Sequence, residues 1–242
     1  FSVFSYVVSL LRPVIIRALE LPRHGLHILP LESTITPLEN GDYLGQWNDH
    51  DQNRRELARH SLRDAEAYDE FGLMLHQMAR AIKPLLAMAP PNPTSFAFSE
   101  LIGMKRLAEH FRTLGPGRFH MLHKLLTMSS ADFLDEWFES DVLKATMSVS
   151  GIIGTFLGVR SPGTAYVLLH HYLGEIDGAF RAWGFCKNGN GGVTQAIASS
   201  ARPHGVEIRT NAAVEQVIVR GGRASGVALA NGDELRAKVV IS

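Results

Sequence analysis

Cysteine is nearly absent from this chain of 242 residues, in which Cys186 stands alone. A disulfide within the chain is therefore excluded, and the composition favours a reducing compartment. We expect the cytoplasm, or the mitochondrial matrix if the source is a eukaryote. An excess of one charge sign is absent too, because 24 Lys and Arg balance 24 Asp and Glu. No overall field attracts a polyanion, so we expect no nucleic-acid partner.

Long apolar runs are missing as well. The run from Phe1 to Leu11 stops at Arg12-Pro13, short of the roughly 20 apolar residues that span a bilayer. It also lacks the basic start and the small-residue cleavage site of a signal peptide. The sequence predicts a soluble protein without a transmembrane segment.

The usual nucleotide and catalytic motifs do not occur. There is no GxGxxG after a strand, no GxxxxGK[ST] and no GxSxG. The three glycines between Gly151 and Gly158 have the wrong spacing for a nucleotide loop and are typical of a loop or of close helix packing. The pairs His24-x-x-His27 and His120-x-x-His123 lack the further ligands of a zinc site, so we predict no metal.

Both ends are expected to lie inside a longer protein. The chain starts at Phe1 rather than Met, within an apolar segment, and stops in Lys238–Ser242. This last segment reads as a buried strand with nothing after it to complete a sheet. Domain boundaries usually fall in polar, flexible linkers instead.

Helical periodicity dominates the chain up to about residue 188. Apolar residues recur at steps of three and four from Asp51 to Met88, with Asp51 as a candidate cap and Pro84 as the expected kink or end. Ser129 or Ser130 is a candidate cap further on. Short β-prone segments around the Asn40-Gly41 turn predict a small ribbon. The other expected helices are 1–20, interrupted by Pro13, and about 100–114, 117–128, 130–138, 140–149 and 163–180.

The pattern changes near residue 189. A helix is expected over 194–201, and the Asn231-Gly232 turn should lead into a last strand. Earlier strands are expected at 206–209, 214–220 and 224–230. We therefore predict an α+β or α/β fold with a largely helical first domain, 1–188, that carries a small β ribbon. The second segment, 189–242, should contain a helix, a strand and a β-meander.

A cluster of aromatic and imidazole side chains is the most distinctive candidate site. Tyr166 and His170 share one face of an expected helix, followed by His171 and Tyr172, and Trp183 comes shortly after. Such a row can line a substrate cavity. The same pattern also fits the core side of an ordinary amphipathic helix, and the pattern alone favours that interpretation.

A series of motifs near the end of the chain has a familiar order. A glycine-rich turn and helix precede a G-x-E-I strand, a V-x-x-V strand, a G-R-A-x-G-V strand, an N-G turn and an A-x-V-V-I-S segment. They are Trp183–Ala198, Gly205–Ile208, Ala213–Val219, Gly222–Val227, Asn231-Gly232 and Ala237–Ser242. This order resembles the phytoene-desaturase-like FAD-dependent oxidoreductases.

Motifs in the rest of the chain resemble one branch of that family, the pyridine nucleotide-disulfide oxidoreductase domain-containing protein 2 group. They are Ser5–Pro13, Leu19–Leu21, His24–Leu26, Trp137–Ser140, Leu143–Thr146 and Gly163–His171. The resemblance implies that 1–188 is the substrate-side domain. It also implies that 189–242 is a partial FAD-binding domain, whose GxGxxG would lie before the chain begins.

The resemblance also implies cofactor residues. The backbone around Val214 would lie against the FAD adenine, and the turn with Gly189, Gly191 and Gly192 would belong to the cofactor side. Val214 is equally explained as a buried strand residue. Asn188 and Asn190 stand where the family tends to have Gly and a hydrophobic residue, and asparagine tolerates left-handed backbone well.

The implied reaction is hydride transfer from a small apolar substrate to the flavin. The residues of the aromatic cluster, namely Tyr166, His170, His171, Tyr172 and Trp183, are the candidates for the substrate cavity, and no general base is assigned. Without the pyrophosphate-binding helix N-terminus, this chain is not expected to retain FAD tightly. Exposed sheet edges predict a homo-oligomer.

Two alternatives stay open. An amine-oxidase-type flavoenzyme would have the same architecture with a C–N bond as its target. A non-catalytic small-molecule-binding or protein-interaction module would use the helices of 51–149 as its surface.

Overall fold

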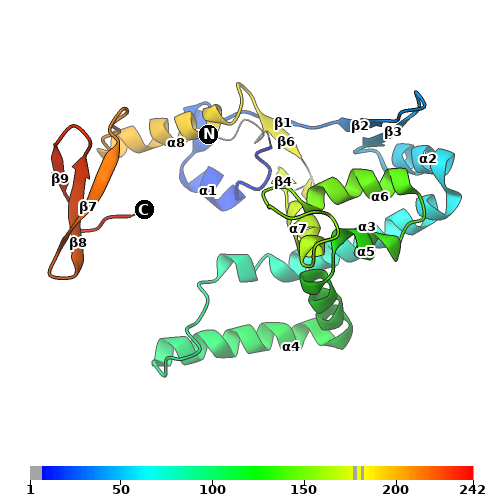
Figure 1. Ribbon diagram of the computed structural model, residues 1–242, viewed down its shortest axis with the longest axis horizontal. Coiled ribbons are helices and arrows are strands. Elements are labelled where there is room, and N and C mark those ends of the chain that lie inside the picture. Colours follow the sequence, from blue (N-terminus) through cyan, green and yellow to red (C-terminus); the bar gives the residue numbers. More distant parts are fainter. Residues whose placement is uncertain (1–6, 177–178, 181–182, 242) are drawn as a thin grey trace.

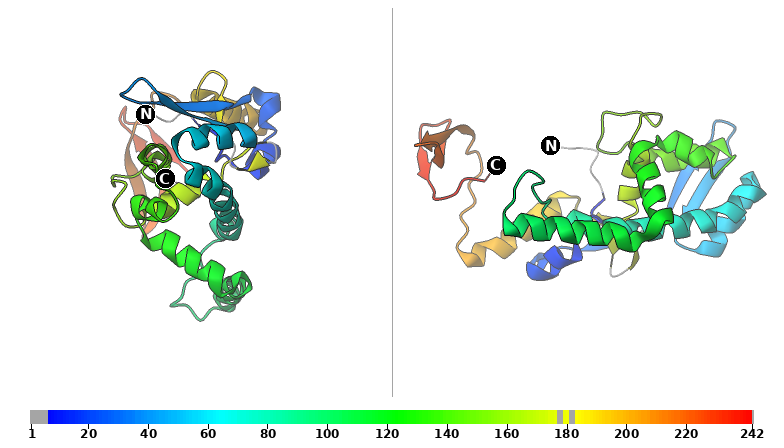
Figure 2. Two further views of the ribbon diagram at one scale, coloured as in Figure 1. Left: turned by 90° about the vertical axis from the view of Figure 1, so that its right-hand side faces the viewer. Right: turned by 90° about the horizontal axis from the view of Figure 1, so that it is seen from below.

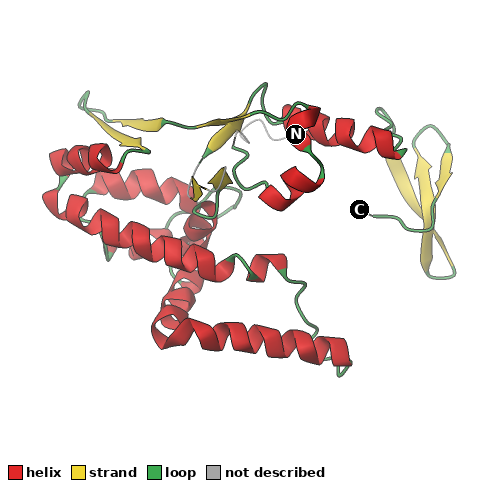
Figure 3. Ribbon diagram, turned by 180° about the vertical axis from the view of Figure 1, so that it is seen from behind, coloured by secondary structure: helices red, strands yellow, loops and turns green. Residues whose placement is uncertain are grey.

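A computed structural model describes residues 7–176, 179–180 and 183–241 and shows three parts in a row (Figure 1). A helical body is joined through a smaller middle part to a β-meander that stands apart beyond one end of a helix (Figures 1 and 3). The described C-terminal end lies beside the meander.

The helical body contains most of the regular structure. Its elements are β2 (Ser33–Pro37), β3 (Tyr43–Trp47), α2 (His50–His60), α3 (Leu62–Ile82), α4 (Phe98–Thr127), α5 (Ser130–Asp135), α6 (Asp141–Ser148), α7 (Thr164–His171), β4 (Glu175–Ile176) and β5 (Ala179–Phe180). The middle part contains α1 (Pro13–Ala18), β1 (Ile28–Pro30), β6 (Gly184–Cys186) and α8 (Gly191–Ala201), and the meander is β7 (Val214–Arg220), β8 (Arg223–Leu229) and β9 (Glu234–Arg236). Short 3-10 turns cover Leu21–His24, Leu85–Ala87, Val149–Gly151 and Arg202–His204.

All strand pairs between the described residues are antiparallel. The pairs are β1 with β6, β2 with β3, and β4 with β5, and the meander has the order β7-β8-β9. The predicted class, a largely helical region with a small ribbon followed by a helix and a meander, is confirmed as α+β.

The core of the helical body is built around Phe71 of α3. Its ring meets Phe138 with 4.9 Å and Trp137 with 5.5 Å between ring centroids, both edge to face. Phe71, Phe133 and Phe138 are almost wholly buried. Aromatic pairs of this kind add about 0.5–1.5 kcal/mol each beyond the burial of their area.

A second, smaller core joins the two segments on either side of residue 188. Leu21 and Leu26 pack with Cys186 and with Ala196 of α8. The boundary between 1–188 and 189–242 stays a prediction, since this core contains residues from both.

The long helix expected over 51–88 is divided, and this prediction is wrong at Ser61. Ser61 has extended backbone and its Oγ accepts from the Asp64 N–H, so it ends α2 and caps α3. The cap of α2 is Asp49 rather than Asp51. At α5 the expectation is confirmed, because the Ser129 side chain accepts from the Asp132 N–H.

Two further helix predictions are too long. The helix expected over 163–180 ends at His171, and 175–176 and 179–180 pair as strands. Of the helix expected over 1–20, residues 1–6 lie outside the described residues, and α1 covers only 13–18. Pro13 begins this helix instead of interrupting it, because its missing N–H is not needed in the first turn.

The prediction of strands at 206–209 and 238–242 is wrong as far as the described residues extend. Neither segment pairs with another described strand, and Val239 and Ile241 are 71% and 91% exposed instead of buried. A strand needs a neighbour for its backbone groups, and these apolar segments have none within the described chain. No helix in the described residues is long and apolar enough to cross a bilayer.

Candidate functional site

Four rings of the predicted aromatic cluster form a continuous row, three of them on α7 and the fourth at Trp183, just before β6. The centroids are 6.3 Å apart for Tyr166 and His170, 5.7 Å for His170 and His171, and 6.2 Å for His171 and Trp183. Tyr166, His170 and Trp183 are half-buried, and His171 is buried. We call these four residues the ring row.

The fifth predicted residue, Tyr172, lies elsewhere. Its ring packs edge to face against Phe71, with 6.5 Å between centroids, at the margin of the main core. It follows the last residue of α7, where the chain turns away from the helix axis. The structure therefore places Tyr172 in core packing rather than in the ring row.

The orientation of His171 is fixed by the backbone of its own helix. Nδ1 lies 2.8 Å from the Val167 carbonyl oxygen. A carbonyl only accepts, so Nδ1 carries a proton and donates it. In the neutral ring this leaves Nε2 as an acceptor.

Burial disfavours the charged forms of two members of the ring row, His170 and Tyr166. Burial lowers the pKa of His170 below its ordinary value, and the neighbouring His171 lowers it further. Burial also raises the pKa of the Tyr166 hydroxyl. Both shifts disfavour the charged state, as expected for groups removed from water.

The start of α7 is positioned by a tight junction with α5. Gly163 caps the helix with a left-handed backbone, φ +84°. Thr164 is buried, and its Oγ1 accepts the Ser130 N–H at 2.8 Å. Gly151 belongs to the same junction, because a Cβ there would lie 2.7 Å from Ser130 Oγ. Close packing at Gly151 and the left-handed backbone of Gly154, φ +76°, agree with the predicted roles of this glycine segment in packing and loop geometry.

The predicted glycine turn lies between β6 and α8. Asn188 and Gly189 both have left-handed backbone, φ +71° and +79°, which confirms that asparagine sustains this turn. Gly192 packs closely, since a Cβ there would lie 2.9 Å from Cys186 Sγ. Gly191, the first residue of α8, has no such neighbour within 4 Å of the position a Cβ would take.

Val214 lies in the wall of a cavity of about 330 Å³ in the meander. An ion pair borders this cavity, with Arg209 Nε 2.6 Å from Glu207 Oε1. The lining residues are Glu207, Arg209, Ala212, Val214, Val227, Leu229 and Leu235. Val214 is 56% exposed, so the interpretation as a buried strand residue is wrong.

The structure does not bring the two predicted cofactor elements together. Gly189, Gly191 and Gly192 lie at the N-terminal end of α8, and Val214 follows beyond its C-terminal end (Figure 1). The other cavity residues were missed by the sequence analysis. The alternation of Val227 and Leu229 along β8 was the available signal, because alternate residues share one face of a strand.

A second cavity of about 430 Å³ lies between α2 and α3. His50 Nδ1 is 3.3 Å from Asp69 Oδ1 in its wall, and Tyr68 and Gly72 complete the lining. Over the described ranges, no three His, Cys, Asp or Glu side chains converge as a metal site would require.

The comparisons with known proteins agree on one family. Residues 48–242 match the model of the flavin-containing amine oxidoreductases. The pyridine nucleotide-disulfide oxidoreductase domain-containing protein 2 of Mus musculus is 37% identical over 260 residues, covering 100% of this chain. This chain spans 44% of the length of that relative.

Two carotenoid-related proteins match over a shorter stretch. The chloroplastic prolycopene isomerase of Daucus carota is 33% identical over 93 residues, which is 38% of this chain and 14% of that protein. The 4,4'-diapolycopene oxygenase of Methylomonas sp. is 45% identical over 82 residues, 34% of this chain and 16% of that protein. These matches confirm the resemblance drawn from the sequence motifs.

Proposed function

The chain belongs to the family of flavin-containing amine oxidoreductases, and we propose that it forms the substrate side and the adenine-binding part of an FAD-dependent oxidoreductase. The substrate would be a small apolar molecule that loses a hydride from a C–H bond. FAD, when bound, supplies the hydride acceptor. Because the chain spans 44% of its relative, this activity is proposed for the longer protein.

The observation that carries the proposal is the position of Val214. It lines a cavity of about 330 Å³ whose wall combines apolar strand residues with the ion pair of Glu207 and Arg209. This volume is near the lower end of the roughly 300–1,000 Å³ typical of small-molecule sites. It fits the adenine end of FAD and not the whole dinucleotide, and the Val214 backbone would hold the adenine.

This chain offers fewer groups that would bind the pyrophosphate of FAD. Gly191 has open space at its Cβ position at the start of α8, but the GxGxxG that ordinarily binds a pyrophosphate does not occur in the sequence. Binding through the adenine alone is weak, so desalting is expected to remove the cofactor.

The ring row is the part of the chain that we propose as the wall of the substrate site. Aromatic faces and the imidazole of His170, whose pKa is lowered by burial, would contact an apolar substrate and exclude water from it. His171 Nε2 adds one acceptor whose direction is set by the bond from Nδ1 to Val167. The row contains no carboxylate, so a cationic amine would find no ion partner among these four residues.

Two substrate classes compete within the proposal. The family's name points to amines, and the two partial matches carry the names of polyene-modifying proteins. The absence of a carboxylate from the ring row favours the apolar class. Quenching of Trp183 fluorescence by a polyene, and not by a primary amine, is the expected result.

Titration of the chain with FAD, followed by flavin fluorescence anisotropy, tests the cofactor part. Val214→Asp replaces an apolar wall residue with a hydrated carboxylate and should weaken binding by about tenfold or more, since the adenine loses its apolar contact at this position. Val219→Asp is the matched control, because Val219 is 61% exposed on the same strand and outside the cavity lining. Equal loss in both variants, or no binding by the wild type, would refute the adenine site.

A further inference from the structure

The cavity around Val214 has an apolar floor. Val214 of β7 lies opposite Leu229 of β8, and Val227 of β8 lies opposite Leu235 of β9. Val227 and Leu229 are two residues apart on one strand, so the two pairs lie on the same face of the meander. All four side chains line the cavity. A planar ring can therefore lie flat on this floor, but the floor has no polar side chain that could distinguish one ring edge from another.

The rim of the cavity is charged. Glu207 and Arg209, in the segment between α8 and β7, line the same cavity, with 2.6 Å between Glu207 Oε1 and Arg209 Nε. The hydrogen bond from Arg209 lowers the pKa of the Glu207 carboxyl, so this group is ionised at neutral pH and only accepts hydrogen bonds. The guanidinium of Arg209 only donates them. The rim therefore presents an acceptor beside a donor.

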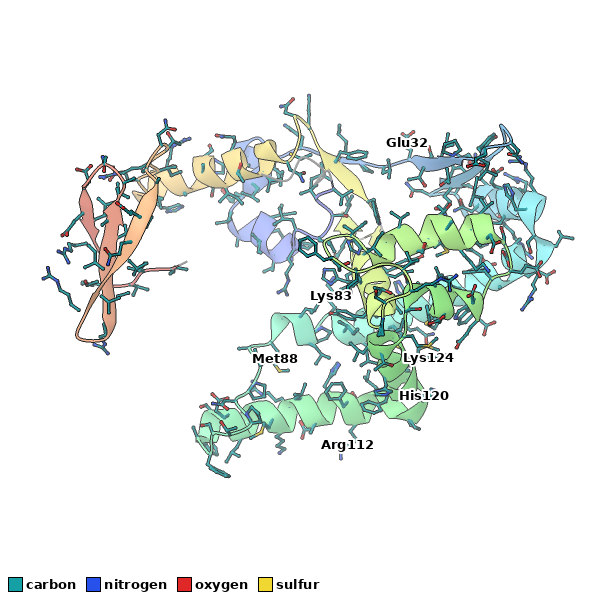
Figure 4. All side chains as sticks on the ribbon, in the orientation of Figure 1. Glu32, Lys83, Met88, Arg112, His120 and Lys124 are labelled. Atoms are coloured by element: carbon teal, nitrogen blue, oxygen red, sulfur yellow. The ribbon has the colours of Figure 1, made fainter. Side chains whose placement is uncertain are left out.

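Part of this ion pair remains accessible to a ligand. Figure 2 shows the meander beyond the C-terminal end of α8, and in Figure 4 its side chains stand apart from those of the helical body. The side chains of Glu207 and Arg209 are 72% and 45% exposed. Among the described residues, these two side chains make one hydrogen bond, from Arg209 Nε to Glu207 Oε1. Glu207 Oε2 and the terminal N–H groups of Arg209 can therefore bind a ligand that lies on the floor.

The edge of an adenine ring carries the complementary groups. Its 6-amino group donates hydrogen bonds, and the ring nitrogen beside it accepts one. In the same orientation, a 6-oxopurine would put a carbonyl oxygen opposite the carboxylate, where two acceptors face each other without a proton. A purine without a 6-substituent would offer the carboxylate no donor at this position. Attraction of the right edge and rejection of the wrong one thus both favour a 6-aminopurine.

We propose that Glu207 and Arg209 read the edge of the bound base and make this cavity selective for 6-aminopurines. Glu207 accepts a hydrogen bond from the 6-amino group, and Arg209 donates one to the adjacent ring nitrogen. The inference rests on the adenine site proposed above and adds base selectivity to it. The apolar floor cannot supply this selectivity, because every base has a face that can stack.

Binding of two nucleosides to the 242-residue chain tests the proposal. Adenosine and purine riboside differ only in the 6-amino group, and saturation-transfer NMR titrations give the dissociation constant of each. We expect the wild type to bind adenosine about fivefold more tightly, at the lower end of the discrimination that a base-reading pair provides, because the rim is exposed. Glu207→Met removes the acceptor and keeps an unbranched side chain, so this preference should disappear while purine riboside binds as before. Arg209→Met should weaken both nucleosides by about threefold, since both contain the ring nitrogen.

Glu234→Met is the matched control. Glu234 pairs with Arg236, two residues later in the chain, as Glu207 pairs with Arg209. Alternation along β9 puts Glu234 on the opposite face from Leu235, and it does not line the cavity. This variant loses the same charge from the same part of the molecule and should keep the preference of the wild type. Circular dichroism checks that each variant is folded.

The outcomes separate this inference from the proposed function. Equal binding of adenosine and purine riboside by the wild type would overturn the reading of the base edge, while the adenine site itself would stand. A preference that survives in Glu207→Met, or that is lost equally in Glu234→Met, would overturn the inference too. Binding of neither nucleoside would overturn both the inference and the adenine site.

Discussion

Nδ1 of His171 donates a hydrogen bond to the carbonyl oxygen of Val167, 2.8 Å away and one helical turn earlier. This bond holds the ring next to His170, with 5.7 Å between the ring centroids. His171 therefore contributes to the lowered pKa of His170. The charge state of His170 decides whether this part of the ring row presents an apolar or a cationic surface to a substrate.

The first prediction concerns the pKa of His170. Burial and the neighbouring His171 both lower it, so NMR titration of the imidazole protons should give a value below the ordinary one of about 6.5. His171→Phe removes the second cause and keeps the ring, so the pKa should rise part of the way back. A pKa that does not change in this variant would mean that the two imidazoles do not interact.

The second prediction concerns the dependence of stability on pH. The folded pKa of His170 is lowered, so as pH falls the unfolded chain takes up this proton before the folded chain does. Protonation therefore stabilises the unfolded state relative to the folded state. The contribution of His170 to the free energy of unfolding decreases as the pH falls from the ordinary pKa to the lower pKa of the folded state. The midpoint temperature of thermal unfolding should decline less between about pH 8 and about pH 5 in His170→Leu than in the wild type. An unchanged slope of the unfolding temperature against pH would contradict the assignment of this pH dependence to His170.

The third prediction concerns Asp64, a carboxylate that is 1% exposed at the start of α3. Its two oxygens accept the backbone N–H groups of Glu139 and Ser140, at 2.8 and 2.9 Å. Asp64→Ala leaves both donors without their acceptor and should cost about 2–4 kcal/mol in the free energy of unfolding. Asp51→Ala, in the exposed first turn of α2, should change it by less than about 0.5 kcal/mol. Similar values for the two variants in urea unfolding would refute the role of Asp64.

The fourth prediction concerns Gly226, which pairs with Arg236 between β8 and β9. A Cβ at this position would lie 2.2 Å from the Leu235 carbonyl oxygen. Gly226→Ala must therefore push β9 away, at a cost of about 1–3 kcal/mol. Amide exchange in β8 and β9 should accelerate and FAD binding should weaken, because β8 and β9 carry cavity residues. Gly158→Ala, in open space with ordinary backbone, should change neither.

Much of the fold could be predicted from local patterns, and the exceptions have a common physical cause. The Asn231-Gly232 turn and the Ser129 cap are chemically specific signals, and both were located correctly. The Ser61 cap was missed because serine also fits a helix interior, and its partners Glu139 and Asp64 become visible only in the fold. The 206–209 and 238–241 segments have strand composition but pair with no strand among the residues that the structure describes.

The candidate site was predicted in part for a similar reason. Periodicity put Tyr166 and His170 on one face of a helix, and the structure places them in ring contact. Tyr172 follows the last helical residue, where periodicity no longer indicates direction, so its place beside Phe71 was not foreseen. The cavity around Val214 depends on the pairing of three strands, which no single segment of sequence encodes.

The central claim is that this chain recognises FAD by its adenine end at Val214. Saturation-transfer NMR on a mixture of the chain and FAD measures which ligand protons touch the protein. We predict strong transfer to the adenine protons and little to the isoalloxazine protons, with the signal abolished by excess adenosine and reduced in Val214→Asp. Transfer confined to the isoalloxazine ring, or none at any concentration of FAD, would contradict the account.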